Sequence, residues 1–516
     1  MQKEKSRVKA SLLNSLVASS GQIVNLVLSF IVRTIFIRTL GEQFLGLNGL
    51  FSNILNILSF TELGIGTAIT FSLYKPLAEN KVNQIRALMH LYSKIYRLIG
   101  AGILLLGFVL MPFLETFISG DKNGLGNIYI AFALYLMNSA FGYFMSYKRS
   151  LFMAAQEGYI NALNLLIFQM LGQIMQILML LLYSNYLVYL IVQLIFTVLS
   201  NVWISVIADN RYKHYLEKTS EKVPQDTIDY LKKNVLGMVS AKLGGVVVFG
   251  TDNIILSSMV GLSIVGIYAN YTMIINGINS VLTQGLGAVT ASLGNFGATK
   301  KKGNNIEVFF KFQLITLLLS TTVVFVFALF STPFIRFWLG SSKYVVTRPT
   351  LYLIVLGFFV SLMRQPLINY TNALGLYWEQ RFKPLFEAGI NLVVSLLLVG
   401  YFKMTISGVL IGTLASNLLV NAWWEPLILF KYGFDSNIKR FLIVYISEFG
   451  SVATILYVLT GFSGRLTTMN IIGQFIIYTT VGLILSIAIT FMEYILIKKM
   501  KLLNSPLIKM KRTKFI

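Results

Sequence analysis

The sequence contains a series of apolar runs of about 20 residues, each long enough for one helix to cross a hydrocarbon layer ~30 Å thick. Hydrophobic residues make up 56% of the 516 residues and charged residues only 12%, as in proteins with many membrane spans. We therefore predict an all-α polytopic membrane protein with fourteen transmembrane helices. The predicted helices span residues 11–35, 44–71, 90–114, 127–147, 160–182, 187–208, 234–259, 263–293, 309–331, 349–373, 384–402, 406–430, 440–461 and 471–497.

Lysine and arginine are unevenly distributed between the two ends of these helices. With the N-terminus in the cytoplasm, 33 of the 43 basic residues fall in inside segments and eight at outside ends and loops. Cytoplasmic loops of membrane proteins collect lysine and arginine, which explains the net charge of +23 without a nucleic-acid partner. The asymmetry predicts that both termini are cytoplasmic.

A segment early in the chain is repeated 220 residues later. Residues 33–73 align without a gap on residues 253–293, with eight identities in the 33 positions from Gly41 onward. Roughly three identities are expected by chance at this composition. The identical pairs include Gly41 with Gly261, Gly46 with Gly266, and Asn56 with Asn276. Because six helices separate the copies, the repeat predicts two lobes of parallel orientation, and its glycines favour close helix packing.

The repeat and one hydrophilic stretch divide the chain into four parts. We predict an N-terminal lobe at 1–208, a cytoplasmic linker at 209–233, a C-terminal lobe at 234–432, and two extra helices with a basic tail at 433–516.

Two motifs within the repeat carry a family resemblance. They read Arg33-x4-Arg38-x-Leu40-Gly41-x4-Gly46 in the first half and Asp252-Asn253-x-Ile255-x5-Gly261-x3-Val265-Gly266-x-Tyr268 in the second. The chain resembles the polysaccharide-transporter branch of the multidrug/oligosaccharidyl-lipid/polysaccharide exporters, and within it the Wzx-type flippases.

The resemblance implies two six-helix lobes around a central cavity that opens alternately to each side of a bacterial cytoplasmic membrane. It implies a substrate in which an oligosaccharide repeat unit is linked to polyprenyl pyrophosphate, for a capsule, an exopolysaccharide or an O-antigen. Membrane lipids, a polysaccharide polymerase and assembly proteins are the implied partners. No cofactor is implied, although transport by such proteins can be coupled to a gradient of H⁺ or Na⁺.

Four basic residues are candidates for holding the pyrophosphate. Arg364 and Lys242 fall inside predicted helices, where a charge costs at least ~2.5 kcal/mol unless it faces a cavity or a partner. Arg33 and Arg38 lie near the outer end of the first helix. The alternative for Arg364 and Lys242 is snorkelling or a bond to a backbone carbonyl. The alternative for Arg33 and Arg38 is anchoring of the helix at the interface.

Two acidic residues are candidates for gating or ion coupling. The repeat places Asp252 opposite the neighbour of Arg33, so we hypothesise an Arg33/Asp252 pair that closes the outer side of the cavity. Glu62 lies late in the second predicted helix and is either a coupling carboxylate or a partner of Lys75. Glu448 lies in the thirteenth predicted helix, and the sequence assigns it no partner.

The sequence lacks the residues of several enzyme classes. It has no glycine-rich loop ending in Gly-Lys-Ser/Thr, no cysteine and only two histidines, His90 and His214. The longest predicted outer loop, 332–348, is short for a membrane glycosyltransferase or polymerase. We therefore predict a transporter and not an enzyme. A flippase for lipid II-type peptidoglycan precursors and a cation-coupled multidrug exporter are the alternatives, and the exporter would favour acidic residues in the cavity.

Overall fold

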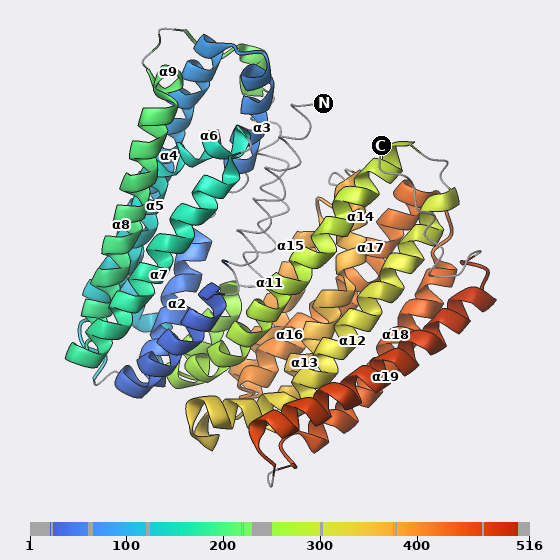
Figure 1. Cartoon of the computed structure of the whole chain (residues 1–516). Helices are drawn as coiled ribbons and strands as arrows, with labels where there is room; N and C mark the ends of the chain where they lie inside the picture. The colour runs from blue at the N-terminus through green and yellow to red at the C-terminus, as the bar shows by residue number, and fades with distance from the viewer. Residues whose placement is uncertain are drawn as a thin grey trace. The chain divides into compact units, whose positions relative to one another are not determined.

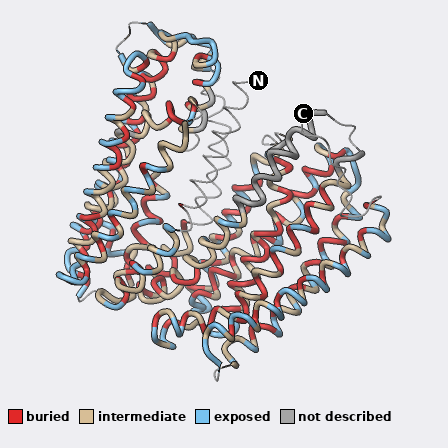
Figure 2. Tube along the Cα trace, in the orientation of Figure 1, coloured by how far each residue is buried: buried red, intermediate tan, exposed pale blue. Residues whose placement is uncertain are grey.

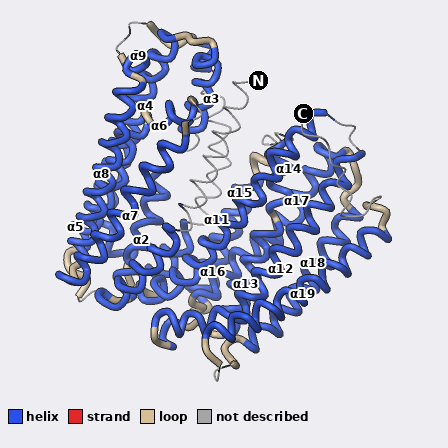
Figure 3. The backbone as a smooth tube through the Cα atoms, in the orientation of Figure 1, coloured by secondary structure: helices blue, strands red, loops and turns tan. Residues whose placement is uncertain are grey.

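The computed structural model consists of helices joined by short loops (Figures 1 and 3). The contacts divide the chain into two compact units, which we call unit 1 (Met1–Asn270) and unit 2 (Tyr271–Ile516). The structure describes residues 21, 24–59, 65–119, 124–155, 157–217, 219, 221–229, 250–299, 303–374, 376, 379–466 and 469–503.

Unit 1 is built around three long helices that pack side by side. These are α5 (Ile128–Ser146), α7 (Gly158–Tyr183) and α8 (Tyr186–Arg211), and α4 (Val82–Leu110) packs against α5. The side chain of Asn185 caps α8 by accepting hydrogen bonds from the amides of Leu187 and Val188. The remaining helical segments are 24–40, α2 (Glu42–Leu58), α3 (Ile65–Ala78), η2 (Met111–Phe117), α6 (Arg149–Ala154), α9 (Lys213–Leu216) and 250–259.

The two longest helices that the structure describes lie wholly or partly in unit 2. The helix α11 (Leu262–Thr299) begins in unit 1 and continues into unit 2, and α12 (Gly303–Leu339) packs along α19 (Ile471–Lys499). The other helices are α13 (Arg348–Met363), α14 (Gln365–Leu374), α15 (Lys383–Leu396), α16 (Ile406–Ser416), α17 (Ala422–Ile428) and α18 (Lys439–Phe462). Short segments join them, namely the 3-10 turn η3 (Ser342–Tyr344) and the π-helical turns η4 (Leu397–Tyr401), η5 (Asn417–Asn421) and η6 (Leu429–Phe434).

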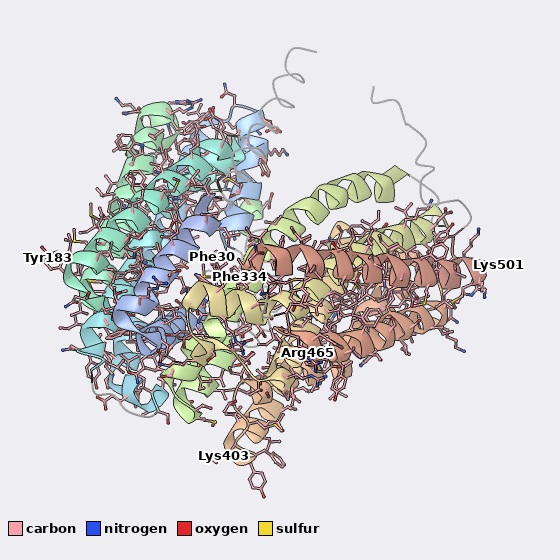
Figure 4. The ribbon with its side chains drawn as sticks, turned by 60° about the horizontal axis from the view of Figure 1, so that its bottom comes forward. Phe30, Tyr183, Phe334, Lys403, Arg465 and Lys501 are labelled. Carbon is pink, nitrogen blue, oxygen red and sulfur yellow. The ribbon has the colours of Figure 1, made fainter. Side chains whose placement is uncertain are left out.

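Within the described ranges, nine helical segments are long and apolar enough to cross a membrane. Many of their large apolar side chains are exposed, for example those of Leu181 and Leu182 on α7, which suits contact with lipid. Figure 2 shows exposed residues along these helices. In unit 2, Lys501 lies at one end of the helices, whereas Lys403 and Arg465 lie toward the other (Figure 4). The predicted placement of Lys403 and Arg465 outside and of the C-terminal tail inside stays a prediction.

The repeated glycines lie where two helices touch. Gly41 and Gly261 precede α2 and α11 with φ of 90° and 130°, a conformation that favours glycine. A Cβ on Gly46 of α2 would lie 1.9 Å from the carbonyl oxygen of Leu262, and one on Gly266 of α11 would lie 2.3 Å from that of Glu42. Each helix thus uses its copy of the glycine to approach the first residue of the other, as the repeat predicts.

The helix limits agree with the prediction within a few residues for α5, α7, α8, α18 and α19. Larger differences occur where helices extend beyond the apolar core: α4 begins at Val82 instead of residue 90, and α12 covers 303–339 instead of 309–331. The extensions at 82–89 and 303–308 contain polar or charged residues, and the extension at 332–339 contains Pro333 and Arg336. The contacts place the unit boundary after Asn270, whereas the predicted division follows the repeat, and the predicted lobes and linker stay a prediction.

Candidate functional site

Unit 1 contains a cavity of about 610 Å³ between α5, α7 and α8. This volume lies within the range of known ligand sites. Amide side chains dominate its polar lining, and aromatic rings cover part of the remainder. The lining includes Arg149, Gln169, Gln173, Gln176, Gln193 and Asn201, with Tyr135, Phe168, Tyr189 and Phe196. Such walls offer both donors and acceptors to a neutral polar molecule.

Arg149 is the basic side chain of this cavity, and all its hydrogen-bond partners are neutral. It donates to Asn161 Oδ1, and its Nη2 lies 3.1 Å from both Ser200 Oγ and Asn201 Oδ1. Among the described residues, no carboxylate lies within salt-bridge distance of it. Burial lowers the pKa of Arg149 to about 10, so the guanidinium is still charged at neutral pH. The cavity therefore holds a positive charge that no carboxylate among the described residues neutralises.

The partners of Arg149 are themselves fixed by hydrogen bonds. Ser200 Oγ donates to Asn164 Oδ1 at 2.8 Å, and Asn164 Nδ2 donates to the carbonyl of Ser200 at 3.2 Å. Asn201 Nδ2 donates to the carbonyl of Thr197 at 3.0 Å. These bonds join α7 to α8 and hold the acceptors in place. Arg149 is thus oriented before any ligand arrives, which lowers the cost of binding.

Arg33 lies beside the other end of this cavity. It is partly buried, and it interacts electrostatically with Tyr135 and Tyr189, which both line the cavity. Its Nη1 atom is buried and has no hydrogen-bond partner in the part of the chain that the structure describes. Gln173 Nε2 connects the same region to the helix of Arg33, because it donates to Asn25 Oδ1 and Ser29 Oγ at 3.2 and 3.0 Å. Arg38, one turn further on, is exposed.

The predicted gate and coupling residues are only partly placed. Within the described ranges no salt bridge joins Arg33 to Asp252, whose charge acts on Tyr268. The Arg33/Asp252 gate stays a prediction. Glu62 and Lys242 lie outside the described residues.

Arg364 belongs to a separate, ionic cluster in unit 2. Pro366 has no amide hydrogen to continue the helix, and Arg364 is the residue between α13 and α14. Its Nη2 and Nε donate to the two carboxylate oxygens of Glu425, at 2.6 and 3.1 Å. Its Nη1 lies 3.4 Å from Glu387 Oε1. This bidentate pairing occupies the atoms that would bind a phosphate group.

Lys383 completes the cluster with a second positive charge. Its Nζ lies 2.6 Å from Glu425 Oε1 and 3.6 Å from Glu387 Oε2. Asn417 accepts from Arg364 at 2.8 Å, and Asn421 donates to Glu387 at 2.6 Å, both from the π-helical turn η5. Two basic and two acidic side chains thus neutralise one another. The role of Arg364 as a pyrophosphate ligand stays a prediction, and in this structure its partners are carboxylates.

The model of the family described as polysaccharide biosynthesis protein matches residues 11–291, which is more than half of the chain. The chain belongs to this family. This confirms the predicted membership of the exporter superfamily. No curated protein sequence matches the chain significantly.

Solved structures with the same fold are membrane transporters. A structure titled "Lipid II flippase MurJ, inward closed conformation" has a TM-score of 0.66 at 14% identity, covering 94% of this chain and all of that one. An inward-facing multidrug resistance MATE family transporter of the MOP superfamily has a TM-score of 0.55 at 14% identity, covering 87% of this chain and all of that one. At this identity they show the fold alone.

The sequence prediction missed the central residue of the cavity in this family member. Arg149 lies between two predicted helices, in a segment counted as a cytoplasmic topology signal. The available signal was a polar stripe on α7, where amide side chains recur every three to five residues. This stripe comprises Asn161, Asn164, Gln169, Gln173 and Gln176. In an apolar helix such a stripe indicates a face turned to a cavity or to a polar neighbour.

Proposed function

We propose that this protein is a flippase that moves an oligosaccharide repeat unit linked to polyprenyl pyrophosphate across the bacterial cytoplasmic membrane. It is not an enzyme in this proposal. Fourteen helices form two lobes of six with two extra helices, both termini are cytoplasmic, and alternating access exposes the cavity to each side. The observation that carries the proposal is Arg149, a charged guanidinium held by neutral side chains in a cavity of amides and aromatic rings.

The cavity offers hydrogen-bonding groups for both polar parts of such a substrate, the pyrophosphate and the sugars. A pyrophosphate forms charge-assisted hydrogen bonds with guanidinium groups, and Arg149 has no competing carboxylate among the described residues. Gln169, Gln173 and Gln193 present donors and acceptors of the kind that sugar hydroxyl groups need. The polyprenyl chain stays in lipid beside the apolar outer face of α7, where side chains such as Leu182 are exposed.

The two alternatives differ in what the cavity must bind. A flippase for lipid II-type peptidoglycan precursors shares the pyrophosphate, and the fold similarity to the lipid II flippase keeps this alternative open. A multidrug exporter of cationic drugs needs negative charge. The described lining of the unit 1 cavity has Arg149 and no carboxylate, so it favours an anionic substrate.

The test is translocation in proteoliposomes that contain the purified full chain. A fluorescent polyprenyl-pyrophosphate oligosaccharide is incorporated, and its arrival in the other leaflet is measured by loss of quenching. We expect transport that is inhibited by excess unlabelled substrate and is insensitive to a cationic drug. Stronger competition by lipid II than by the oligosaccharide substrate would move the assignment to peptidoglycan precursors.

Arg149→Gln is the decisive variant in this assay. Loss of one charge-assisted hydrogen bond costs about 1.5–3 kcal/mol, which predicts about 10- to 100-fold weaker substrate binding. Arg149→Lys keeps the charge without the fork and should retain part of the activity. Unchanged transport by a folded Arg149→Gln protein would remove this cavity from the mechanism.

A further inference from the structure

Two buried glutamates lie in the last two helices and belong neither to the cavity lining nor to the Arg364 cluster. Glu448 is on α18 and Glu493 on α19, and they are 0% and 2% exposed. The helices α12, α18 and α19 pack against one another, so these carboxyl groups lie inside a three-helix contact (Figure 1). Neither residue contributes to the proposed substrate site.

Each glutamate has one neutral hydrogen-bond partner. Gln313 Nε2 on α12 donates to Glu448 Oε2 at 2.7 Å, and Ser447 Oγ donates to Glu493 Oε1 at 2.6 Å. Among the described residues, no lysine or arginine forms a salt bridge with either carboxyl group. The two glutamates are therefore unlike Glu425, which has two basic partners.

The charged and titratable groups around the pair do not supply the missing positive charge. On α18, Tyr445 lies within electrostatic range of Glu448 on one side and of the Arg364 and Glu425 pair on the other. Arg364 is engaged with Glu425. On α12, Lys311 forms a salt bridge with Glu307. Two ionised carboxylates would thus lie in a lipid-embedded helix contact without compensation.

A bare carboxylate in such surroundings is expensive, and a proton removes the cost. One oxygen of each group also lacks a partner in the structure. Gln313 Oε1, Glu448 Oε1 and Glu493 Oε2 are all buried and receive no hydrogen bond from described residues. Gln313 is 0% exposed, and its amide already touches Glu448. A proton on Glu448 Oε1 would create the donor that Gln313 Oε1 lacks and would complete a two-bond acid–amide pair.

We propose that Glu448 and Glu493 form a proton-binding site in the C-terminal helix pair, and that this site links transport to the proton gradient. A sodium ion fits less well, because one Na⁺ would leave a net negative charge on two carboxylates that have separate partners. Release of the proton from Glu448 places a negative charge near Tyr445, which is also within electrostatic range of Arg364 and Glu425. Through Tyr445 the charge of Glu448 acts on the Arg364 cluster, which lies in the predicted C-terminal lobe. Proton occupancy is independent of the proposed function, whereas the link to transport rests on it.

Infrared difference spectroscopy of the full chain in lipid tests the occupancy. A protonated carboxyl group has a carbonyl band at higher frequency than a carboxylate. We expect this acid band at pH 7 in the wild type, its partial loss in Glu448→Gln and in Glu493→Gln, and its loss at alkaline pH. Glu157→Gln is the matched control, because partly buried Glu157 is ionised in its pair with Arg211 and should lose only a carboxylate band. Carboxylate bands alone at pH 7, or an acid band that disappears when Na⁺ replaces K⁺, would overturn the proposal.

Transport tests the second part. Glu448→Gln replaces the acid by an amide that keeps a donor for Gln313, so the melting temperature should stay close to that of the wild type. We expect an imposed proton gradient to change the translocation rate of the wild type, and we expect this change to be at least tenfold smaller in Glu448→Gln. An unchanged response contradicts the coupling. Absence of translocation by the wild type would contradict the proposed function instead, and the infrared result would still decide the proton site.

Discussion

The two halves of this chain surround a buried arginine in opposite ways. Arg149 in unit 1 is held by Asn161, Ser200 and Asn201, all of them neutral, beside an open cavity. Arg364 in unit 2 is held by Glu425 and Glu387 with Lys383 close by. Both arginines are partly buried. The comparison shows that the partners of a buried arginine, more than its depth, decide whether it is free to bind an anion.

This difference assigns different roles to the two arginines. Removing one partner of a buried ion pair destabilises the fold, because it leaves the other charge uncompensated. A guanidinium held by neutral acceptors costs less to remove, and its charge is available to a ligand. We therefore expect substitutions of Arg364 to act on stability and substitutions of Arg149 to act on transport.

The largest expected effect is that of Arg364→Gln on folding. Loss of this guanidinium leaves Glu387 and Glu425 with only Lys383, and breaking a buried pair costs about 3–5 kcal/mol. Thermal unfolding in detergent should show a markedly lower midpoint than that of Arg149→Gln. Equal midpoints for the two variants would break the comparison between the clusters.

The next effect concerns the glycines that the two copies of the sequence repeat share. Gly46→Ala and Gly266→Ala each place a Cβ against a backbone carbonyl that cannot move aside easily. Overpacking of this kind costs about 1–3 kcal/mol. Because the two contacts are reciprocal, we expect similar losses of stability in thermal unfolding. Gly102→Ala, whose Cβ would meet nothing within 4 Å, is the matched control and should be neutral or stabilising. A large loss for only one glycine would show that the symmetry of this contact is superficial.

The same contrast explains what the sequence reveals. Helices such as α7 and α19 are predictable, because each is a continuous apolar run of membrane length. Gly46 and Gly266 are predictable, because the repeat marks them. The partners of Arg364 are not, since Glu387 and Glu425 lie 23 and 61 residues away along the chain. Pairing at that sequence separation depends on tertiary packing, which the periodicity of a single helix does not predict.

Arg149 was missed for a related reason. Its helix, α6, has six residues and contains no apolar run of membrane length. Its function in the fold depends on Asn161, 12 residues away, and on Ser200 and Asn201, more than 50 residues away. A basic residue between two spans is usually a topology signal. Only the polar stripe of α7 distinguished Arg149 from such a signal. The stripe does not indicate which basic residue packs against it in the fold.

The smallest expected effect comes from the neighbour of Arg149 and isolates the contribution of its neutral partners. Lys148 lies next in the chain and is also basic, but its Nζ lies 2.7 Å from both carboxylate oxygens of Asp209. The side chain of Lys148 is 13% exposed and that of Asp209 is 52% exposed, so water screens the pair, and such pairs contribute about 0–1 kcal/mol. Lys148→Gln should therefore reduce stability only slightly and leave substrate affinity within about twofold, since a charge that is already paired contributes little to a distant anion.

Binding of the labelled oligosaccharide substrate to Lys148→Gln and Arg149→Gln, at two salt concentrations, measures this difference. If simple proximity of positive charge attracted the substrate, both variants would lose affinity to a similar degree, and salt would weaken binding by the wild type and by both variants alike. If the absence of a carboxylate partner is what matters, only Arg149→Gln loses affinity. In that case the neutral side chains around Arg149 are part of the binding site as much as the arginine itself, because they hold its charge without neutralising it.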